Sequence, residues 1–420
     1  MKLLINLCAH DGIISHYTGV GTMVERYILS IQKVLMKNHI DFDINLFTPQ
    51  YNTDSFGYSK QIEENNKSKK NVKIFKVENG SGGKVNFGRI KNWEKLCENT
   101  AKIINNIPLE NYSQILNIAN DVPYACLNKF LTYDVKQKFV WIPHSTAKIF
   151  KIDSALKNPE SSFLERLNWE NSAISDINKC SNAYAGAISK FMFKHLIEDY
   201  NIKKEKLISI VNGEILESKV EREYNFRDIN LFKSIEKYNS IMISFGRAEP
   251  YKNFEGAMLL GRELGIDTII IAQSYFKTQP IIKQYKKIAK LTKSHLYIDP
   301  PFDFAKYILT NFKGKIIVLV PSLREPMGLI VNEVRRLNKD NILLVANDTD
   351  GLKEQIQDKD NGLLIDINNL KYSAEKIKKY FNNKSMKSFS LNSQKILVKN
   401  YNMNKNMETF LTYLIGGINE

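Results

Sequence analysis

The sequence predicts an α/β protein with two doubly wound parallel sheets, one in each half of the chain. Apolar runs typical of buried strands alternate with helical patterns from end to end, as in parallel sheets covered by helices. A charged, aperiodic segment over residues 218–240 separates the two series, as expected of a connector. The 420 residues allow each half its own core. We therefore expect domains over residues 1–215 and 216–400.

The composition is that of a globular protein, with 43% hydrophobic and 25% charged residues. No apolar run approaches the roughly 20 residues that a membrane-spanning helix needs. The apolar start of the chain is too short for a signal peptide before Asp11. These observations predict a cytoplasmic protein.

Four scattered cysteines, without a Cys-x-x-Cys pair or a histidine at metal-ligand spacing, predict free thiols in a reducing compartment. The net charge of +15 comes from both halves, with 28 basic and 22 acidic residues over 1–215 and 32 and 23 in the remainder. Such an excess favours membrane headgroups, nucleic acid or phosphorylated substrates. A lysine-rich proteome would produce the same excess.

The first half opens with a predicted buried strand over 2–8, a glycine-containing loop and a helical pattern over 23–36. Such a loop lies at the carboxyl end of its strand, where doubly wound domains bind ligands. Gly19 and Gly21 would let the backbone approach a phosphate or the acceptor.

Further strands and helices continue the alternation. The strand FVWIPHST ends in His144 and Ser145, where an α/β sheet presents its ligand residues. Polar segments over 51–71 and 79–89 are interpreted as surface loops. The remaining predicted elements of this half are strands over 44–47, 114–119, 183–189 and 207–212 and helices over 91–106, 122–131, 162–181 and 190–200.

The second half is organised around residues 316–333, IIVLVPSLREPMGLIVNE. The continuous apolar, β-branched run that opens this stretch is typical of a parallel strand covered on both faces. We expect a helix at or soon after Pro326, since proline suits the first helical position. Unpaired N–H groups at that helix start, with Gly328 allowing a close approach, favour an anion such as a diphosphate.

Glu325 should then precede the helix, and Glu333 should lie about two turns inside it. Eight helical residues separate two side chains by roughly 80° and 12 Å. This spacing suits one elongated ligand that is held at two points.

The other predicted elements of the second half also alternate. Its strands are expected to begin at residues 241, 267, 294, 342 and 361, and its helices cover residues 280–291, 303–311, 370–383 and 403–415.

The string Pro-Ser-Leu-x-Glu-Pro-x-Gly-Leu, followed by a second Glu after seven intervening residues, resembles the donor-site signature of the retaining GT-B glycosyltransferases of family 4. In that family the first Glu contacts hydroxyls of the donor sugar, and the second holds the ribose of the nucleotide. The Gly-Leu amides face the diphosphate. The resemblance implies these roles for Glu325, Glu333, Gly328 and Leu329.

A Gly-Arg pair after the first strand of the second domain, with a Lys five residues on, also matches the family pattern. The resemblance implies that Arg247 and Lys252 reach the donor diphosphate, where two fixed cations can stabilise the leaving group without a metal. The chain departs from the family at residues 338–340 and 350–351, where a small-residue turn and a Gly-Gly pair are usual. The resemblance therefore does not assign the contacts nearest the sugar.

In the first half, the resemblance implies that the loop with Gly19 and Gly21 lines the donor cleft. It also implies that His144 lies beside the donor sugar. Asn212 and the residue after it would mark the hinge between the domains, and Asn212 would lie near the bound donor. The polar loops would face the acceptor, and residues 401–420 would pack back on the first domain.

The resemblance thus implies two doubly wound domains facing across a cleft in the GT-B architecture. The implied activity is transfer of a hexose or N-acetylhexosamine, with retention, from a nucleotide diphosphate sugar to an acceptor hydroxyl. The default donor is UDP-linked, and neither a cofactor nor a metal is expected. An anionic or lipid-linked acceptor and contact with the inner face of the membrane are compatible with this reading, whereas nucleic acid is not expected as a partner.

Two other classes remain open. A phosphorylase or nucleotide-sugar epimerase could use the same fold, but a phosphorylase needs a cofactor-binding lysine that the sequence does not identify. The chain could also be a non-catalytic protein that binds a sugar nucleotide or nucleic acid. The presence of Glu325, Arg247, Lys252 and Glu333 argues against that class.

Overall fold

The structure is a computed structural model of the whole chain. It describes residues 2–83, 89–149, 160–217, 226–274, 280–301 and 303–416. Contacts divide the chain into two compact units, and the C-terminal segment belongs to the first of them. Unit 1 comprises Met1–Ile215 and Asn402–Glu420, and unit 2 comprises Leu216–Tyr401.

Unit 1 contains a parallel sheet of seven strands in the order β3-β2-β1-β4-β5-β6-β7. The order reverses between β1 and β4, so the loops after these two strands diverge at the ligand-binding edge of a doubly wound sheet. The strands are β1 (Lys2–Cys8), β2 (Asp41–Pro49), β3 (Val72–Val77), β4 (Gln114–Asn120), β5 (Gln137–Ile142), β6 (Ala183–Ala187) and β7 (Leu207–Ser209).

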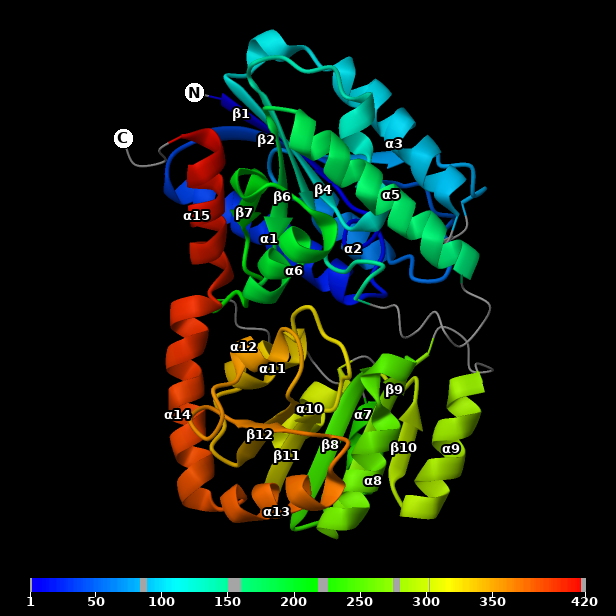
Figure 1. The fold of residues 1–420 in the computed structure, drawn as a ribbon, viewed down its shortest axis with the longest axis vertical. Coiled ribbons are helices and arrows are strands. Elements are labelled where there is room, and N and C mark those ends of the chain that lie inside the picture. The colour runs from blue at the N-terminus through cyan, green and yellow to red at the C-terminus, as the bar shows by residue number, and fades with distance from the viewer. Residues whose placement is uncertain are drawn as a thin grey trace. The chain divides into compact units, whose positions relative to one another are not determined.

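Helices cover both faces of this sheet (Figure 1). On one face, α3 (Ile90–Asn105) and α5 (Glu160–Lys179) bury aromatic and aliphatic side chains against the strands. Elsewhere in unit 1, α1 (Gly19–Lys37) packs against α15 (Met403–Ile415), and Lys37 Nζ lies 3.0 Å from Glu408 Oε1. The remaining helices are α2 (Lys60–Lys67), α6 (Lys190–Tyr200) and the short 3-10 helices η1 (Leu109–Asn111), η2 (Val122–Tyr124), η3 (Leu127–Phe130) and η4 (Lys204–Lys206).

A row of buried amide side chains crosses the middle of this sheet. Asn45 donates to Asn6 Oδ1 at 3.0 Å, and Asn6 donates to Asn117 Oδ1 at 2.8 Å. Asn6 faces Asn45 on β2 and Asn117 on β4 in the strand register. A shift of one residue would break every bond in the row and leave buried amides unpaired, so the row helps to specify the register.

Unit 2 contains a parallel sheet of six strands in the order β10-β9-β8-β11-β12-β13. Here the order reverses between β8 and β11. The strands are β8 (Ser240–Arg247), β9 (Asp267–Gln273), β10 (His295–Ile298), β11 (Lys315–Val320), β12 (Ile342–Asn347) and β13 (Leu363–Ile365).

Two hydrophobic clusters lie on the two faces of the second sheet. One cluster contains side chains of α8 (Phe254–Leu264), α9 (Pro280–Thr292), α13 (Leu370–Tyr380) and α14 (Asn383–Asn400). The other contains side chains of α7 (Phe226–Lys233), α10 (Phe304–Asn311), α11 (Leu329–Arg336) and α12 (Leu352–Gln355). The 3-10 helix η5 (Pro250–Lys252) joins β8 to α8.

The prediction of two parallel, doubly wound sheets is confirmed, but several local predictions are wrong. The first helix begins at Gly19, four residues before its predicted start, because Thr18 caps it. The helix expected over 122–131 is replaced by η2 and η3, whose apolar residues are buried except for the partly buried Phe130. The apolar residues of this segment gave it the pattern of a buried helix. Pro123 and the close packing on α3 instead favour short 3-10 turns.

Several elements arise where none was predicted. The polar loop over 51–71 contains α2, and β3 directly follows it. The connector contains α7, and α14 extends the C-terminal helices. Of the second polar loop, residues 84–88 lie outside the described part of the chain. Among the helices that the structure describes, none has the length and apolar character required to cross a membrane.

Candidate functional site

The candidate site of unit 2 lies where the strand order of its sheet reverses. β8 ends at Arg247 and β11 ends at Val320, and these two strands are neighbours. The loops that follow them therefore leave the same edge of the sheet in different directions. In open α/β sheets the crevice at this point is the usual place for a ligand.

A buried ion pair joins the two loops. Lys252 Nζ lies 2.5 Å from Glu325 Oε2, and both side chains are only about one-eighth exposed, at 13% and 12%. Ser322 donates to the same carboxylate oxygen at 3.2 Å. Burial alone would lower the pKa of Lys252, but the carboxylate of Glu325 outweighs it and raises that pKa. Lys252 is therefore a fixed cation at neutral pH.

Arg247 is oriented by the same loop. Its Nη2 donates to the Tyr251 hydroxyl at 2.5 Å, and the main-chain oxygen of Tyr251 accepts the Leu323 N–H at 2.8 Å. Burial raises the pKa of Tyr251, although the neighbouring Arg247 acts in the opposite direction. The phenol is therefore a neutral partner that holds the guanidinium without cancelling its charge. The structure thus brings Arg247, Lys252 and Glu325 into one connected cluster.

Asp350 and Gly351 hold the main chain on both sides of Glu325. Asp350 Oδ2 accepts the Glu325 N–H at 3.2 Å, and its Oδ1 accepts from Arg324 Nη1 at 3.0 Å. Gly351 N–H donates to Glu325 O at 2.9 Å. These residues stand where the resembled family has a Gly-Gly pair, so this chain holds its Glu325 loop with a side-chain carboxylate. The sequence showed that Asp350 and Gly351 replace the Gly-Gly pair, but it did not show that they bind the Glu325 loop.

The start of α11 differs from the prediction. The helix begins at Leu329, because Gly328 has φ −74° and ψ 92° and is not helical. Glu333 is therefore the fifth residue of the helix, little more than one turn inside it. The predicted two turns, and the spacing derived from a continuous helix from Glu325 to Glu333, are wrong.

The chain itself engages one amide at this helix start. With the Gln355 amide turned over, the orientation in which both of its polar atoms are satisfied, its oxygen accepts the Gly328 N–H at 2.9 Å and its nitrogen donates to Gly328 O at 3.2 Å. The N–H groups of Leu329 and Ile330 are donors without an acceptor inside an α-helix, whereas the Val331 N–H already donates to Gly328 O at 3.1 Å. An anion at this terminus would therefore meet Leu329 first, with Gly328 held behind it.

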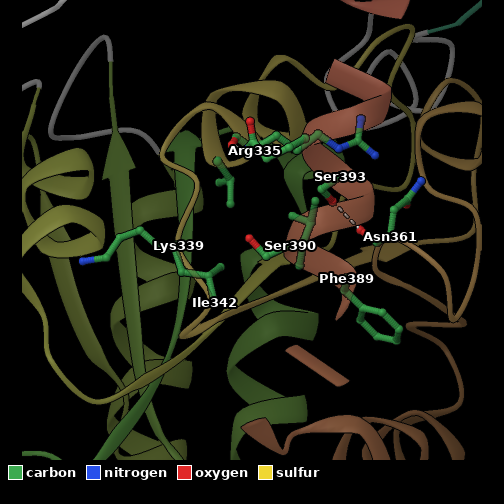
Figure 2. A pocket seen from close by; sticks show the side chains of 10 residues that line it. Arg335, Lys339, Ile342, Asn361, Phe389, Ser390 and Ser393 are labelled. Carbon is green, nitrogen blue, oxygen red and sulfur yellow. Dashed lines mark hydrogen bonds between the residues drawn. The ribbon is translucent and has the colours of Figure 1, made fainter. Parts of the chain in front are cut away.

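A small cavity lies on the other side of α11, between that helix, β12 and α14 (Figure 2). Its volume of about 20 Å³ has room for one water and is far too small for a sugar nucleotide. Arg335 lines it, and burial lowers the pKa of this guanidinium to about 10. Figure 2 shows the Lys339 side chain directed away from the other lining residues. This cavity is not the candidate site.

In unit 1, His144 follows β5 and lies near two partners from other strands and helices. Its Nε2 is 3.4 Å from Asn120 Oδ1, and its ring centroid is 5.9 Å from that of Tyr27. Burial lowers the pKa of His144 to about 4, despite the opposing effect of Asp121. The imidazole is therefore neutral at pH 7 and can donate or accept a hydrogen bond without carrying charge.

The segment after His144 is held by a network that the sequence analysis did not identify. Glu170 is fully buried and accepts the Ala147 N–H at 2.9 Å. Arg166 Nε donates to Glu170 at 2.7 Å, and its Nη2 donates to Ser145 Oγ at 3.1 Å. Arg166 and Glu170 are four residues apart on α5, and this spacing was the only sequence signal for the pair.

Gly19 and Gly21 lie in the first turn of α1 and not in the preceding loop. The Gly21 N–H donates to Thr18 Oγ1 at 3.3 Å. The buried carboxylate of Asp11 accepts from Thr18 Oγ1 at 2.7 Å and from the Thr18 N–H at 2.8 Å. A Cβ on Gly21 would lie 2.5 Å from Asp11 Oδ2, so glycine is required here for packing. An internal carboxylate thus lies at this helix start, where a phosphate or the acceptor was expected.

Asn212 is only 2% exposed and accepts the Tyr27 hydroxyl at 2.5 Å. Its main-chain N–H donates to Ile188 O at 3.1 Å. The first of these bonds holds the chain at Asn212 against α1, and the side-chain oxygen of Asn212 is occupied by Tyr27. The described residues contain no group of three or more His, Cys, Asp or Glu side chains arranged for a metal ion.

We expect the buried, neutral His144 to make unfolding pH-dependent. Its pKa in the folded protein lies below the ordinary 6.5, so the stability linked to the neutral form is complete above pH 6.5 and is lost as the pH falls towards 4. The loss should reach about 3 kcal/mol. Urea unfolding of the wild type and His144→Gln between pH 4 and 8 measures it, since only the wild type should show this component. Equal pH profiles would contradict it.

Comparison with known families supports the motif of unit 2. Residues 227–396 match the family model of glycosyl transferases group 1, which confirms the resemblance to glycosyltransferases for that segment. The comparison with curated proteins gives no match.

Solved structures match nearly the whole chain at low identity. Sucrose-phosphate synthase from Thermosynechococcus elongatus is 13% identical, with a TM-score of 0.71 over 97% of this chain and 96% of its own. The catalytic domain of starch synthase IV from Arabidopsis thaliana, bound to ADP and acarbose, gives 13% and 0.68 over 99% of each chain. Anabaena HepE in complex with UDP-glucose gives 13% and 0.67, also over 99% of each. These similarities show that the fold is GT-B.

Proposed function

We propose that this chain, whose residues 227–396 carry a domain of the glycosyl transferases group 1 family, is a retaining glycosyltransferase. It transfers a hexose or N-acetylhexosamine from a nucleotide diphosphate sugar to an acceptor hydroxyl and needs no metal. The observation that carries the proposal is the cluster of Arg247, Lys252 and Glu325 at the point where the strand order reverses. The two fixed cations suit the negative charge of a diphosphate, and the carboxylate beside them can accept hydrogen bonds from sugar hydroxyls.

The cations act on the leaving group. As the bond between the sugar and the diphosphate breaks, negative charge gathers on the departing phosphate oxygen. Arg247, Lys252 and the Leu329 amide stabilise this charge without reorganisation, and each such contact is worth roughly 2–4 kcal/mol in the transition state. Glu325 holds donor hydroxyls, Glu333 holds the ribose, and the neutral His144 orients the sugar.

With these side chains engaged by the donor, the acceptor attacks from the face that the diphosphate leaves. The acceptor oxygen bonds to the anomeric carbon while the carbon–oxygen bond to phosphate breaks, and the acceptor proton passes to the departing phosphate oxygen. The products are a nucleoside diphosphate and a glycoside with the configuration of the donor. UDP is the proposed nucleotide, since HepE was solved with UDP-glucose, although starch synthase IV was solved with ADP.

The proposal is tested by incubating the protein with a panel of UDP-, ADP- and GDP-sugars and following release of the nucleoside diphosphate with and without EDTA. We expect release from one donor class, unchanged by the chelator, and an α-linked product from an α-linked donor by NMR. Loss of activity in EDTA that Mn²⁺ or Mg²⁺ restores would contradict the metal-independent mechanism. A β-linked product would contradict retention, and dependence on free phosphate would indicate a phosphorylase.

The two carboxylates should give different kinetic defects. Glu333→Gln should raise KM more than it lowers kcat, since ribose contacts are equal in the ground and transition states. Glu325→Gln should mainly lower kcat, because its contact strengthens as the sugar becomes positively charged. Steady-state kinetics with the donor found in the panel measures both. Identical defects in the two variants would show that these roles are wrong.

A further inference from the structure

The positive charge of unit 2 is concentrated near the end of its sequence. Residues 370–400 contain eight lysines and one acidic residue, a net excess of seven. The part of the chain after residue 215 has 32 basic and 23 acidic residues, an excess of only nine. Most of the surplus thus lies on α13 and α14.

On α14 seven of the exposed residues form one stripe. They are Lys384, Lys387, Ser388, Leu391, Lys395, Val398 and Lys399, and we call them the α14 stripe. The terminal residues Asn383 and Asn400 are also exposed but lie outside it. At 100° for each residue these positions lie within about 120° of the helix circumference and extend for roughly 22 Å. The opposite side of the helix buries Met386, Phe389, Ser393 and Leu397, so the stripe faces away from the core of unit 2.

The four lysines of the stripe have no carboxylate partner among the described residues. By contrast, Lys376 on α13 is paired with Asp358 at 2.8 Å. α14 itself contains no acidic residue. One carboxylate from another segment lies on this helix, since Asp360 Oδ1 accepts from Asn392 Nδ2 at 2.8 Å. Four lysines outweigh that single carboxylate, so the field stays positive and extends into solvent over about a Debye length.

Two large aliphatic side chains lie between these lysines. Leu391 and Val398 are each 56% exposed. An apolar side chain at such a position gains free energy only when another surface removes it from water. Lysine ammonium groups alternating with aliphatic side chains match the chemistry of an anionic lipid surface, with phosphates outside and acyl chains beneath them.

Nucleic acid fits this stripe less well. Proteins that bind it generally use arginine for bidentate phosphate contacts and aromatic rings for stacking on bases. The stripe has neither, and residues 370–400 contain no arginine. The aliphatic side chains would also lie against phosphates without being covered.

We propose that the α14 stripe binds the surface of a bilayer that contains anionic lipid and so holds unit 2 at the membrane. The lysines supply the attraction, and Leu391 and Val398 enter the headgroup region. This binding does not depend on the proposed transferase activity.

The experiment is flotation of the full chain with vesicles of phosphatidylcholine, with and without phosphatidylglycerol. We expect binding only to the anionic vesicles. The variant with Lys384, Lys387, Lys395 and Lys399 all changed to Gln should lose at least about tenfold in partition coefficient. Leu391→Ser with Val398→Ser should weaken binding most at high salt, where the electrostatic attraction is screened.

α9 provides a control that is matched in charge. It carries four exposed lysines, Lys283, Lys286, Lys287 and Lys290, and no acidic residue. Its exposed aliphatic side chain, Leu291 at 65%, follows the last of these lysines near the end of the helix and does not lie between them. Changing these four to Gln removes the same charge, and binding should stay within about twofold of the wild type.

Three outcomes would overturn the proposal. They are no binding of the wild type to anionic vesicles, an equal loss in the α9 variant, or binding of double-stranded DNA that depends on the α14 lysines and exceeds vesicle binding. Unchanged thermal unfolding of each variant ensures that the comparison concerns folded protein.

Discussion

Replacing Lys252 by Met is expected to lower kcat by about 10²- to 10³-fold and the free energy of unfolding by about 3 kcal/mol. The activity falls because the departing diphosphate loses one of its two fixed cations. The stability falls because Glu325, only 12% exposed, loses the ammonium 2.5 Å away and remains as a buried, uncompensated charge. Urea unfolding and donor turnover at pH 7.5 measure the two effects separately.

The pH dependence of this pair has a definite sign. Because the pKa of Lys252 is raised in the folded protein, the stability it contributes is fully present below its ordinary pKa of 10.5. That contribution is lost only as the pH rises through the higher folded value. The stability difference between the wild type and Lys252→Met should therefore not change between pH 7 and 9 through titration of the lysine.

A double variant separates structure from chemistry. Lys252→Met combined with Glu325→Gln removes both charges, so stability should return towards that of the wild type while activity stays low. Recovery of activity in the double variant, or full activity in Lys252→Met alone, would show that the lysine does not act on the leaving group.

Gly351→Ala is expected to damage the same site through the main chain. A Cβ at this position would lie 2.3 Å from Pro326 O and 3.0 Å from Glu325 O. Both neighbours are backbone atoms, so no side chain can move aside and the Glu325 loop must shift. We expect a loss of about 1–3 kcal/mol in unfolding free energy. A displacement of 1 Å at Glu325 would lower kcat by about a hundredfold.

Gly265→Ala is the control for this prediction. Gly265 ends α8 with φ 69°, and a Cβ there would meet nothing within 4 Å. The control carries the conformational cost of a positive φ, about 1 kcal/mol, without a steric contact at the site. We expect it to retain full activity. Wild-type kcat in Gly351→Ala would show that the Asp350-Gly351 segment does not position Glu325.

Much of the fold could be read from local patterns. The strand over 316–320 is an unbroken apolar run, and Val318 is completely buried in the structure. Such runs arise because a strand covered on both faces has no solvent side, so burial determines every position. The motif over 316–333 could be recognised equally well, since all of its residues lie in one continuous segment of the chain.

Elements with weak apolar periodicity were not predicted from the sequence. α14 is rich in Ser, Asn and Lys, and only four side chains that include Met386 and Leu397 are buried on its inner side. α2 lies in a segment that is polar throughout, but Glu63 within it is 4% exposed and pairs with Lys67 and Lys76. Tertiary partners stabilise these helices, and the local apolar pattern is too sparse to predict them.

The sequence by itself determined which chemical groups are available and the order of the strands and helices that carry them. It placed Arg247 at the end of a strand and Glu325 just before a helix, because strand periodicity and turn residues are local properties. Only the tertiary structure decided which groups meet. Lys252 and Glu325 are 73 residues apart and Asp350 lies 25 residues beyond Glu325, and these contacts follow from the order of strands in the sheet. The same holds for the Asp11 carboxylate at the start of α1, since no periodic pattern specifies how a loop folds back on the helix that follows it.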